Sequence, residues 1–184
     1  MNIYFRLSIL LLFLFTGCTL PVNRTYFKPI PTEKIKAHIS NYKGYHKTAK
    51  DALLGTVDGI TIKIKPWLNR GENIYVSITF IYEKGPLNIK ANNIILIAND
   101  KRYKPISSSV EDREHITFDN RNSVGDERIS FIHVEYPVIS DKLDKLEIKI
   151  PNFIFKNKKI ISKELYFKFK KETVSDIRFY TING

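Results

Sequence analysis

The sequence is poor in sulfur and tryptophan, with one Cys, one Met and one Trp among 184 residues. A single cysteine cannot form a disulfide within the chain, and it is too few for a thiolate zinc site, a redox pair or an iron–sulfur centre. Glycine and proline number eight each and form no repeat, which excludes a collagen-like or linker-type chain. Hydrophobic residues make up 43%, with 12 Phe and 10 Tyr, and exclude a disordered chain. One folded domain is therefore predicted.

Motifs that carry catalysis are also missing. The sequence has no nucleophile elbow, phosphate-binding glycine loop, His-Glu-x-x-His helix or dinucleotide fingerprint. Its four histidines stand far apart, without the spacing of metal ligands: His38, His46, His115 and His133. The fold can still bring His115 and His133 together with Asp119 or Asp126. The sequence predicts neither an enzyme nor a bound cofactor.

One group of oxygen-bearing side chains has the chemistry that calcium prefers. Its members are Asp119, Asn120, Asn122, Asp126 and Glu127. Their spacing misses the known calcium-loop pattern, so a solvated loop is predicted here rather than a metal site.

The first twenty residues combine a short apolar run with the lone cysteine. One positive charge, Arg6, precedes residues 7–15, which are apolar apart from Ser8. This run is shorter than the roughly 20 residues needed to cross a membrane, and it has the length of a signal-peptide core. Three residues, Phe15, Thr16 and Gly17, directly precede Cys18.

These residues resemble the lipobox of bacterial lipoproteins, with Phe15 standing where Leu is usual. The resemblance implies a signal peptide over residues 1–17, cleavage after Gly17, and acyl chains such as palmitate on Cys18. Each buried CH₂ group contributes roughly 0.8 kcal/mol, so two or three chains hold a protein at a membrane. In such families Thr19, rather than Asp, implies for a Gram-negative cell an outer-membrane location facing the periplasm or the surface. The alternatives are an ordinary secretory signal and an uncleaved anchor.

The rest of the chain divides at about residue 55. Residues 18–55 show no sustained period and carry Pro21, Pro29 and Pro31, which predicts a lipidated cysteine and an extended tether, with a short helix near residues 48–54. Residues 56–184 alternate polar and apolar side chains, as in residues 60–65 and 74–82, which predict a hairpin. Residues 107–127 lack this pattern and predict a mobile loop with a short strand at residues 116–118.

About seven to nine short strands, with no helix long enough to join parallel strands, predict an all-β fold. We expect an antiparallel two-sheet sandwich, immunoglobulin-like or transthyretin-like, over residues 56–184. The segments 145–151, 153–155, 157–160 and 165–169 resemble the closing strands of immunoglobulin-like bacterial surface domains. The cysteine pair of true immunoglobulin domains is missing, so the resemblance implies the fold class alone. A small barrel fits the same pattern.

The formal net charge of +11 is unevenly distributed, since residues 142–171 hold ten lysines against three acidic residues. On the strands the basic residues fall on the polar positions: Lys63, Lys65, Lys145, Lys149, Lys168 and Lys170, with Tyr166 among them. If these strands are neighbours, the lysines form one cationic patch for anionic lipid headgroups, lipopolysaccharide or another polyanion. The alternative is a solvated face that keeps strand edges soluble, in a sequence rich in Ile, Lys and Asn.

The sequence therefore predicts a lipid-anchored lipoprotein of the bacterial cell envelope that acts by binding, as a protein-binding or structural accessory module. Strand addition is a general route by which such a sandwich binds a protein partner. The alternative function is capture of an anionic envelope ligand by the lysine-rich strand faces. Nucleic acid is not an expected partner of an exported domain, and the oligomeric state is left open.

Overall fold

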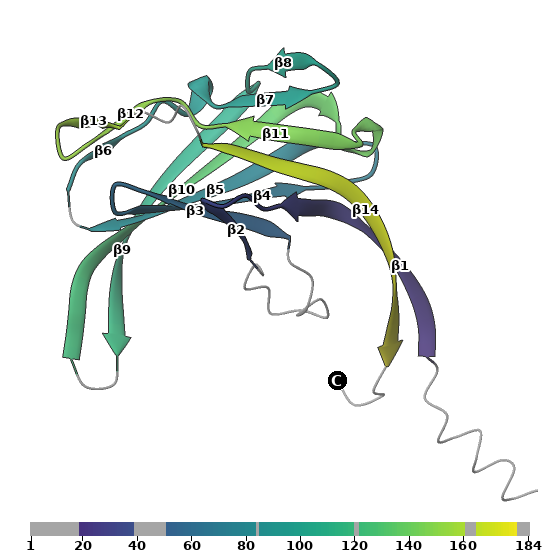
Figure 1. Ribbon diagram of the computed structural model, residues 1–184, viewed down its shortest axis with the longest axis horizontal. Helices are drawn as coiled ribbons and strands as arrows, with labels where there is room; N and C mark the ends of the chain where they lie inside the picture. The colour runs from purple at the N-terminus through teal and green to yellow at the C-terminus, as the bar shows by residue number, and fades with distance from the viewer. Residues whose placement is uncertain (1–18, 39–50, 84, 120–121, 161–164, 180–184) are drawn as a thin grey trace, which may run out of the picture. The chain divides into compact units, whose positions relative to one another are not determined.

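The structure is a computed structural model that describes residues 19–38, 51–83, 85–119, 122–160 and 165–179. These residues form fourteen strands and two single-turn 3-10 helices, η1 (Ala91–Asn93) and η2 (Ser140–Lys142). Every strand pair with a defined register is antiparallel. The predicted all-β, antiparallel sandwich is confirmed (Figure 1).

The strands form three sheets. The five-stranded sheet has the order β1 (Thr19–Ile30), β14 (Tyr166–Phe179), β11 (Lys145–Lys149), β7 (Ile95–Ala98) and β8 (Lys101–Tyr103). The six-stranded sheet has the order β2 (Ile35–His38), β3 (Ala52–Val57), β4 (Ile60–Trp67), β5 (Asn73–Glu83), β10 (Asn122–Ile139) and β9 (Ser107–Asp119). The smallest sheet joins β13 (Lys158–Ile160), β12 (Phe153–Phe155) and β6 (Leu87–Asn88).

The chain divides into two compact units. Residues 26–172 form the larger one, which contains the sandwich. The described residues of the smaller unit are 19–25 of β1 and 173–179 of β14. Within it, the Thr25 and Thr173 hydroxyls lie 2.8 Å apart, and the Ser175 hydroxyl donates to Asn23 at 2.7 Å. The smaller unit is therefore a two-stranded ribbon.

The core of the sandwich follows from the period of two. On β4, Ile60, Ile62 and Ile64 are fully buried, and the residues between them are half-buried. A methyl group built on Gly55 of β3 would lie 3.4 Å from the ring of Phe167 on β14, so the two large sheets touch at this glycine. The smallest sheet contacts β5 through the Phe80 and Phe153 rings, which meet edge-to-face with centroids 5.8 Å apart.

Three hairpins close with two-residue turns in which both residues have positive φ. These turns are Asp58-Gly59, Asn99-Asp100 and Lys156-Asn157. This geometry matches the right-handed twist of the flanking strands, and Asn, Asp and Gly are the residues that adopt it most readily. The predicted hairpin of residues 60–65 and 74–82 is confirmed as β4 and β5.

The predicted tether is wrong for the described part of residues 18–55, because residues 19–30, 35–38 and 52–55 lie in strands. A strand at Ala52–Val57 also replaces the expected helix near residues 48–54, of which residues 48–50 lie outside the described ranges. β1 carries only two inward side chains in its larger-unit part, Phe27 and Pro29, too few to show a period. Pro29 is tolerated because β1 is an edge strand.

The predicted mobile loop at residues 107–127 is also wrong, although the short strand expected at residues 116–118 does lie within a strand. Residues 107–119 form β9 and residues 122–139 form β10, which pair from Asn122 opposite Asp119 to Glu135 opposite Ser107. β9 lies at the edge of its sheet, where its described side chains, residues 107–112, are exposed. Because no face of these residues is fully buried, the chain needs no alternation of polar and apolar residues there.

Candidate functional site

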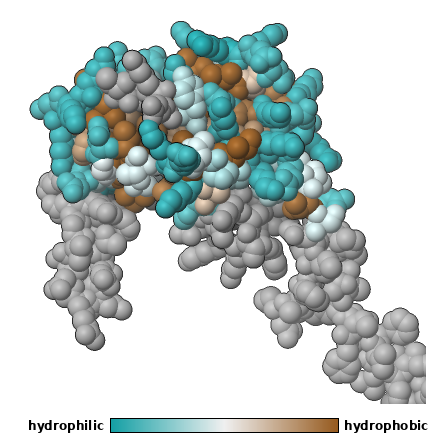
Figure 2. All heavy atoms as spheres, viewed as in Figure 1, coloured by the Kyte–Doolittle hydropathy of each residue, from teal (hydrophilic) through white to brown (hydrophobic). Residues whose placement is uncertain are grey.

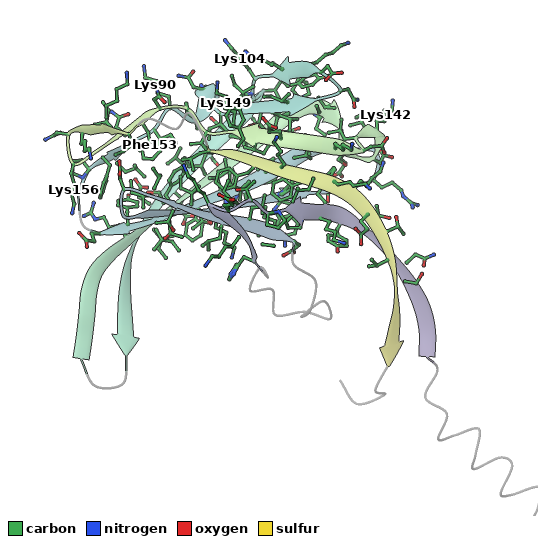
Figure 3. The ribbon with its side chains drawn as sticks, in the orientation of Figure 1. Lys90, Lys104, Lys142, Lys149, Phe153 and Lys156 are labelled. Atoms are coloured by element: carbon green, nitrogen blue, oxygen red, sulfur yellow. The ribbon has the colours of Figure 1, made fainter. Side chains whose placement is uncertain are left out.

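Five of the seven residues expected in a cationic patch come together on the five-stranded sheet. On the outward face of β11 and β14, Lys145 lies opposite Lys170, Glu147 opposite Lys168, and Lys149 opposite Tyr166. The intervening residues Leu146, Ile148, Phe167 and Phe169 are buried. We call Lys145, Lys149, Tyr166, Lys168 and Lys170 the lysine face; Figure 3 labels Lys149 within it.

Two contacts shape the lysine face. The Lys168 ammonium lies 3.4 Å from a Glu147 carboxylate oxygen, and the Lys149 ammonium lies 5.6 Å from the centre of the Tyr166 ring. Lys145 and Lys170, in contrast, place two positive charges opposite each other. Like charges at directly opposite positions destabilise a strand pair, and a bound anion would relieve this repulsion.

The other two predicted lysines lie elsewhere, which corrects the expectation of one patch. Lys63 and Lys65 belong to β4 in the six-stranded sheet. The Lys65 ammonium contacts a carboxylate oxygen of buried Asp51 at 2.8 Å and lies 4.0 Å from the centre of the Trp67 ring. The Lys65 side chain is 13% exposed and the Asp51 side chain 9%. This pair is therefore an internal ion pair rather than an open cationic surface.

Burial also shifts ionisation next to this pair. Burial lowers the pKa of Lys63, and Lys65 lowers it further, while Asp51 opposes the shift. The pKa of His38 on β2 is lowered by burial first and by the charge of Lys63 second, with Asp51 again opposing. Sequence reasoning missed Asp51, which comes directly before β3 and carries no periodic signal.

A row of hydrogen bonds crosses the outward face of the six-stranded sheet next to Lys65. The Trp67 indole donates to the Ser77 hydroxyl at 2.9 Å, and this hydroxyl lies 3.2 Å from Nδ1 of His133. The Tyr75 ring stacks on the imidazole with centroids 5.8 Å apart. Because the indole only donates, the Ser77 oxygen accepts there and its proton is free to point to His133. The row ties β4, β5 and β10 together.

The histidines and carboxylates considered as ligands are placed only in part. His38 lies on β2 and His133 on β10, with three strands between them in the sheet. His46 and Asn120 lie outside the described ranges, and the side chains of His115, Asp119, Asn122, Asp126 and Glu127 are not described. Within the part of the chain that the structure describes, no three His, Cys, Asp or Glu side chains converge as metal ligands would.

A polar hollow of about 520 Å³ lies where β5 and β10 meet the loop after β4. It is lined by Asn69, Gly71, Glu72, Asn73, Tyr75, Glu135 and Ile139. Asn73 and Ser107 each donate to one oxygen of the Glu135 carboxylate, at 2.9 and 3.1 Å. Ser140 fastens the loop, since its amide donates to the Glu72 carbonyl at 2.9 Å. Sequence reasoning gave no signal for this hollow, because its residues come from two segments that are far apart in the chain, 69–75 and 135–139.

The edge strand β9 is the second exposed feature of the sandwich. In the described six-stranded sheet it has 13 residues and one neighbour, β10. Two large apolar side chains are exposed beside this edge, Ile106 at 57% and Val110 at 54%. Figure 2 shows apolar residues, in brown, interspersed with hydrophilic ones, in teal, on the described part of the visible face.

Residues 1–18, which include Phe15, Thr16, Gly17 and Cys18, lie outside the described ranges. β1 begins at Thr19, directly after the predicted anchor. Among the described residues there is no helix with the length and apolar character needed to span a bilayer.

Comparison with known proteins gives no family. No family model matches the chain, and no curated protein matches it. Among solved structures, the chain is similar to the GAE domain of GGA2p from Saccharomyces cerevisiae, with 13% sequence identity and a TM-score of 0.27. The match covers 71% of this chain and 98% of that domain.

Proposed function

We propose that the protein is a lipoprotein of the bacterial envelope, anchored through Cys18, whose sandwich binds an extended segment of a protein partner along β9. The observation that carries the binding proposal is the position of β9, a 13-residue strand at the end of its sheet. Such an edge presents a row of backbone donors and acceptors to a further strand.

Side chains along β9 define the segment that fits. Val110 is exposed on the strand and Ile106 directly precedes it, so both offer apolar contact to an added strand. Glu111 and Asp112 are also exposed, which favours a partner strand with basic side chains at the opposing positions. Backbone hydrogen bonds would supply affinity, and these side chains would supply selectivity.

The anchor is supported by the motif at residues 15–18 and limits the reach of the domain. Seven residues, 19–25, separate Cys18 from the larger unit. At roughly 3.3 Å per residue, the eight steps from Cys18 to residue 26, where the larger unit begins, span at most about 26 Å. The anchored sandwich would therefore act close to its membrane.

The binding proposal is tested by affinity capture of the full chain from its own membranes in mild detergent, with mass spectrometry of the retained proteins. We expect Val110→Lys to lose the partner, because a charged edge side chain blocks strand addition. Ile154→Lys is the matched control, since Ile154 on β12 is similarly exposed at 45%. Equal capture by both variants would contradict a β9 site.

The anchor is tested separately with Cys18→Ser. The wild-type protein should stay in the membrane fraction after a salt wash, and the variant should leave it. Retention of Cys18→Ser in the washed membranes would refute lipidation as the anchor.

The second candidate function is capture of an anionic ligand by the lysine face, and the Lys145–Lys170 juxtaposition favours it. We expect the protein to bind vesicles that contain phosphatidylglycerol and not vesicles of phosphatidylcholine alone. Lys145→Gln with Lys170→Gln should weaken binding, whereas Lys90→Gln with Lys159→Gln, at exposed positions outside the lysine face, should change it little. Binding that is insensitive to salt would count against this function.

A further inference from the structure

The two edge strands β8 and β9 lie on the same side of the sandwich. β8 ends the five-stranded sheet and β9 ends the six-stranded sheet. Only residues 104–106 connect them. Four steps of roughly 3.3 Å reach about 13 Å, little more than the roughly 10 Å between packed sheets. We call residues 101–112, from the start of β8 to Asp112 on β9, the edge band.

Charge is segregated along the edge band. At its β8 end Lys101, Arg102 and Lys104 are exposed and basic. At its β9 end Glu111 and Asp112 are exposed and acidic. Figure 3 labels Lys104, which stands at the β8 end. The edge band therefore carries opposite charge at its two ends.

The middle of the edge band is apolar. Of the four large hydrophobic side chains that are exposed in the described ranges, Ile106 and Val110 lie here, between the two charged ends. The residues between them, Ser107, Ser108 and Ser109, are small and exposed, so no bulky side chain hinders close approach of another surface.

A surface with this order of charges is complementary to itself after a half-turn. We propose that two copies of the protein pair through their edge bands about a two-fold axis. The basic end of each copy then faces the acidic end of the other, and the apolar middles meet near the axis. Such an interface is closed and uses the same patch on both copies. This inference rests on the proposed function, because it names a second copy of the chain as the partner at β9.

Anchoring in one membrane would favour this pairing. Two molecules held in the same plane have a raised effective concentration, so a contact of modest area suffices to pair them. The charges at the two ends also set the orientation, since the parallel arrangement would bring like charges together.

The test uses charge reversal in the full chain, purified in mild detergent and examined by native mass spectrometry. A basic-end variant carries Lys101→Glu and Arg102→Glu, and an acidic-end variant carries Glu111→Lys and Asp112→Lys. Each variant alone should dimerise about tenfold more weakly than the wild type, because both contacts of its dimer become repulsive. Mixing the two variants should restore dimers that contain one copy of each.

Recovery of dimers in the mixture would show that both variants are folded. It would also show that the single variants lose dimers because their charges repel, and not because the substitutions disrupt the fold. A wild-type protein that stays monomeric, a single variant that dimerises as strongly as the wild type, or a mixture that forms no more dimer than the single variants would each overturn the inference. The capture experiment tests the proposed function separately. If Val110→Lys loses a captured protein that is not a second copy of this chain, the β9 site is upheld and self-pairing is rejected. A Lys101→Gln and Lys104→Gln variant should show intermediate dimerisation, because it removes charge without reversing it.

Discussion

Lys145 on β11 and Lys170 on β14 lie directly opposite each other in the five-stranded sheet, with both side chains exposed on its outward face. Their neighbours are arranged differently: Lys168 has Glu147 as its cross-strand partner, and Lys149 has the Tyr166 ring. The like-charge pair Lys145–Lys170 therefore destabilises the lysine face locally, whereas Lys168 and Lys149 each have a favourable partner.

Replacing Lys170 by Glu should stabilise the sandwich, because it turns a like-charge pair into an opposite-charge pair. We expect the free energy of unfolding to rise by about 0.5 kcal/mol at low salt, the scale of an exposed cross-strand pair. Urea denaturation at low and at high salt measures the change. A gain that persists unchanged at high salt would show that repulsion is not its cause.

Asp51→Asn should destabilise the protein strongly, since it leaves the Lys65 ammonium largely buried without its carboxylate at 2.8 Å. We expect a loss of about 2 to 4 kcal/mol in the free energy of unfolding. The control is Asp58→Asn, because Asp58 forms an exposed and longer contact of 3.8 Å with Lys158, and Asn also tolerates its positive φ of 47°. That variant should lose less than about 1 kcal/mol.

Acidification should reveal the lowered pKa of His38, which burial and the Lys63 charge hold below its ordinary value of 6.5. The unfolded chain then binds a proton at a higher pH than the folded chain does. The stability that the folded state gains from a neutral His38 is complete above the unfolded pKa of about 6.5. It falls as the pH drops from there to the pKa of His38 in the folded state.

The pH dependence is measured by denaturation of the wild type and His38→Gln between about pH 5 and pH 8. The wild type should lose more stability than the variant on acidification. Parallel pH profiles for the two proteins would contradict the prediction.

Tyr82→Phe should cost about 1 to 2 kcal/mol, because it removes the partner of a buried polar group. The Tyr82 and Ser130 hydroxyls lie 2.7 Å apart inside the sandwich. Adding Ser130→Ala to Tyr82→Phe should recover part of this loss, since the orphaned hydroxyl is then gone. The two single variants and the double variant form a cycle in chemical denaturation, and strictly additive losses would show that the hydroxyls do not interact.

The sequence predicts well those strands whose two faces differ in burial. Ile60, Ile62 and Ile64 alternate with half-buried residues, and β4 lies where this pattern places it. The same reasoning fails at β9, whose described side chains are all exposed, and at β1, where Phe27 and Pro29 are the inward residues. Edge strands such as β1 and β9 have less buried surface to impose a period, whereas the interior strand β3, where a helix was expected, is too continuously buried at Ala52 and Leu53 to alternate.

The candidate sites depend on sheet order, which a single sequence does not fix. The alternation of Lys145, Lys149, Lys168 and Lys170 indicates an outward face, but only the pairing of β11 with β14 joins these residues. Lys65 shows the same alternation and yet meets Asp51, because β3 and β4 are neighbours in the other sheet. Periodicity tells which way a side chain points within its strand, while its neighbours are set by long-range pairing.

The pairing of β1 with β14 has a consequence for the order of assembly. β1 is the first described strand and β14 the last, and Thr25 meets Thr173 across 148 positions of the chain. During synthesis, β1 emerges long before the strand that it must join. The five-stranded sheet can be completed only after almost the whole chain has emerged, and contacts of such long range slow folding. β1, whose described neighbour in the sheet is β14 alone, therefore has no strand to pair with until the last described strand has been made.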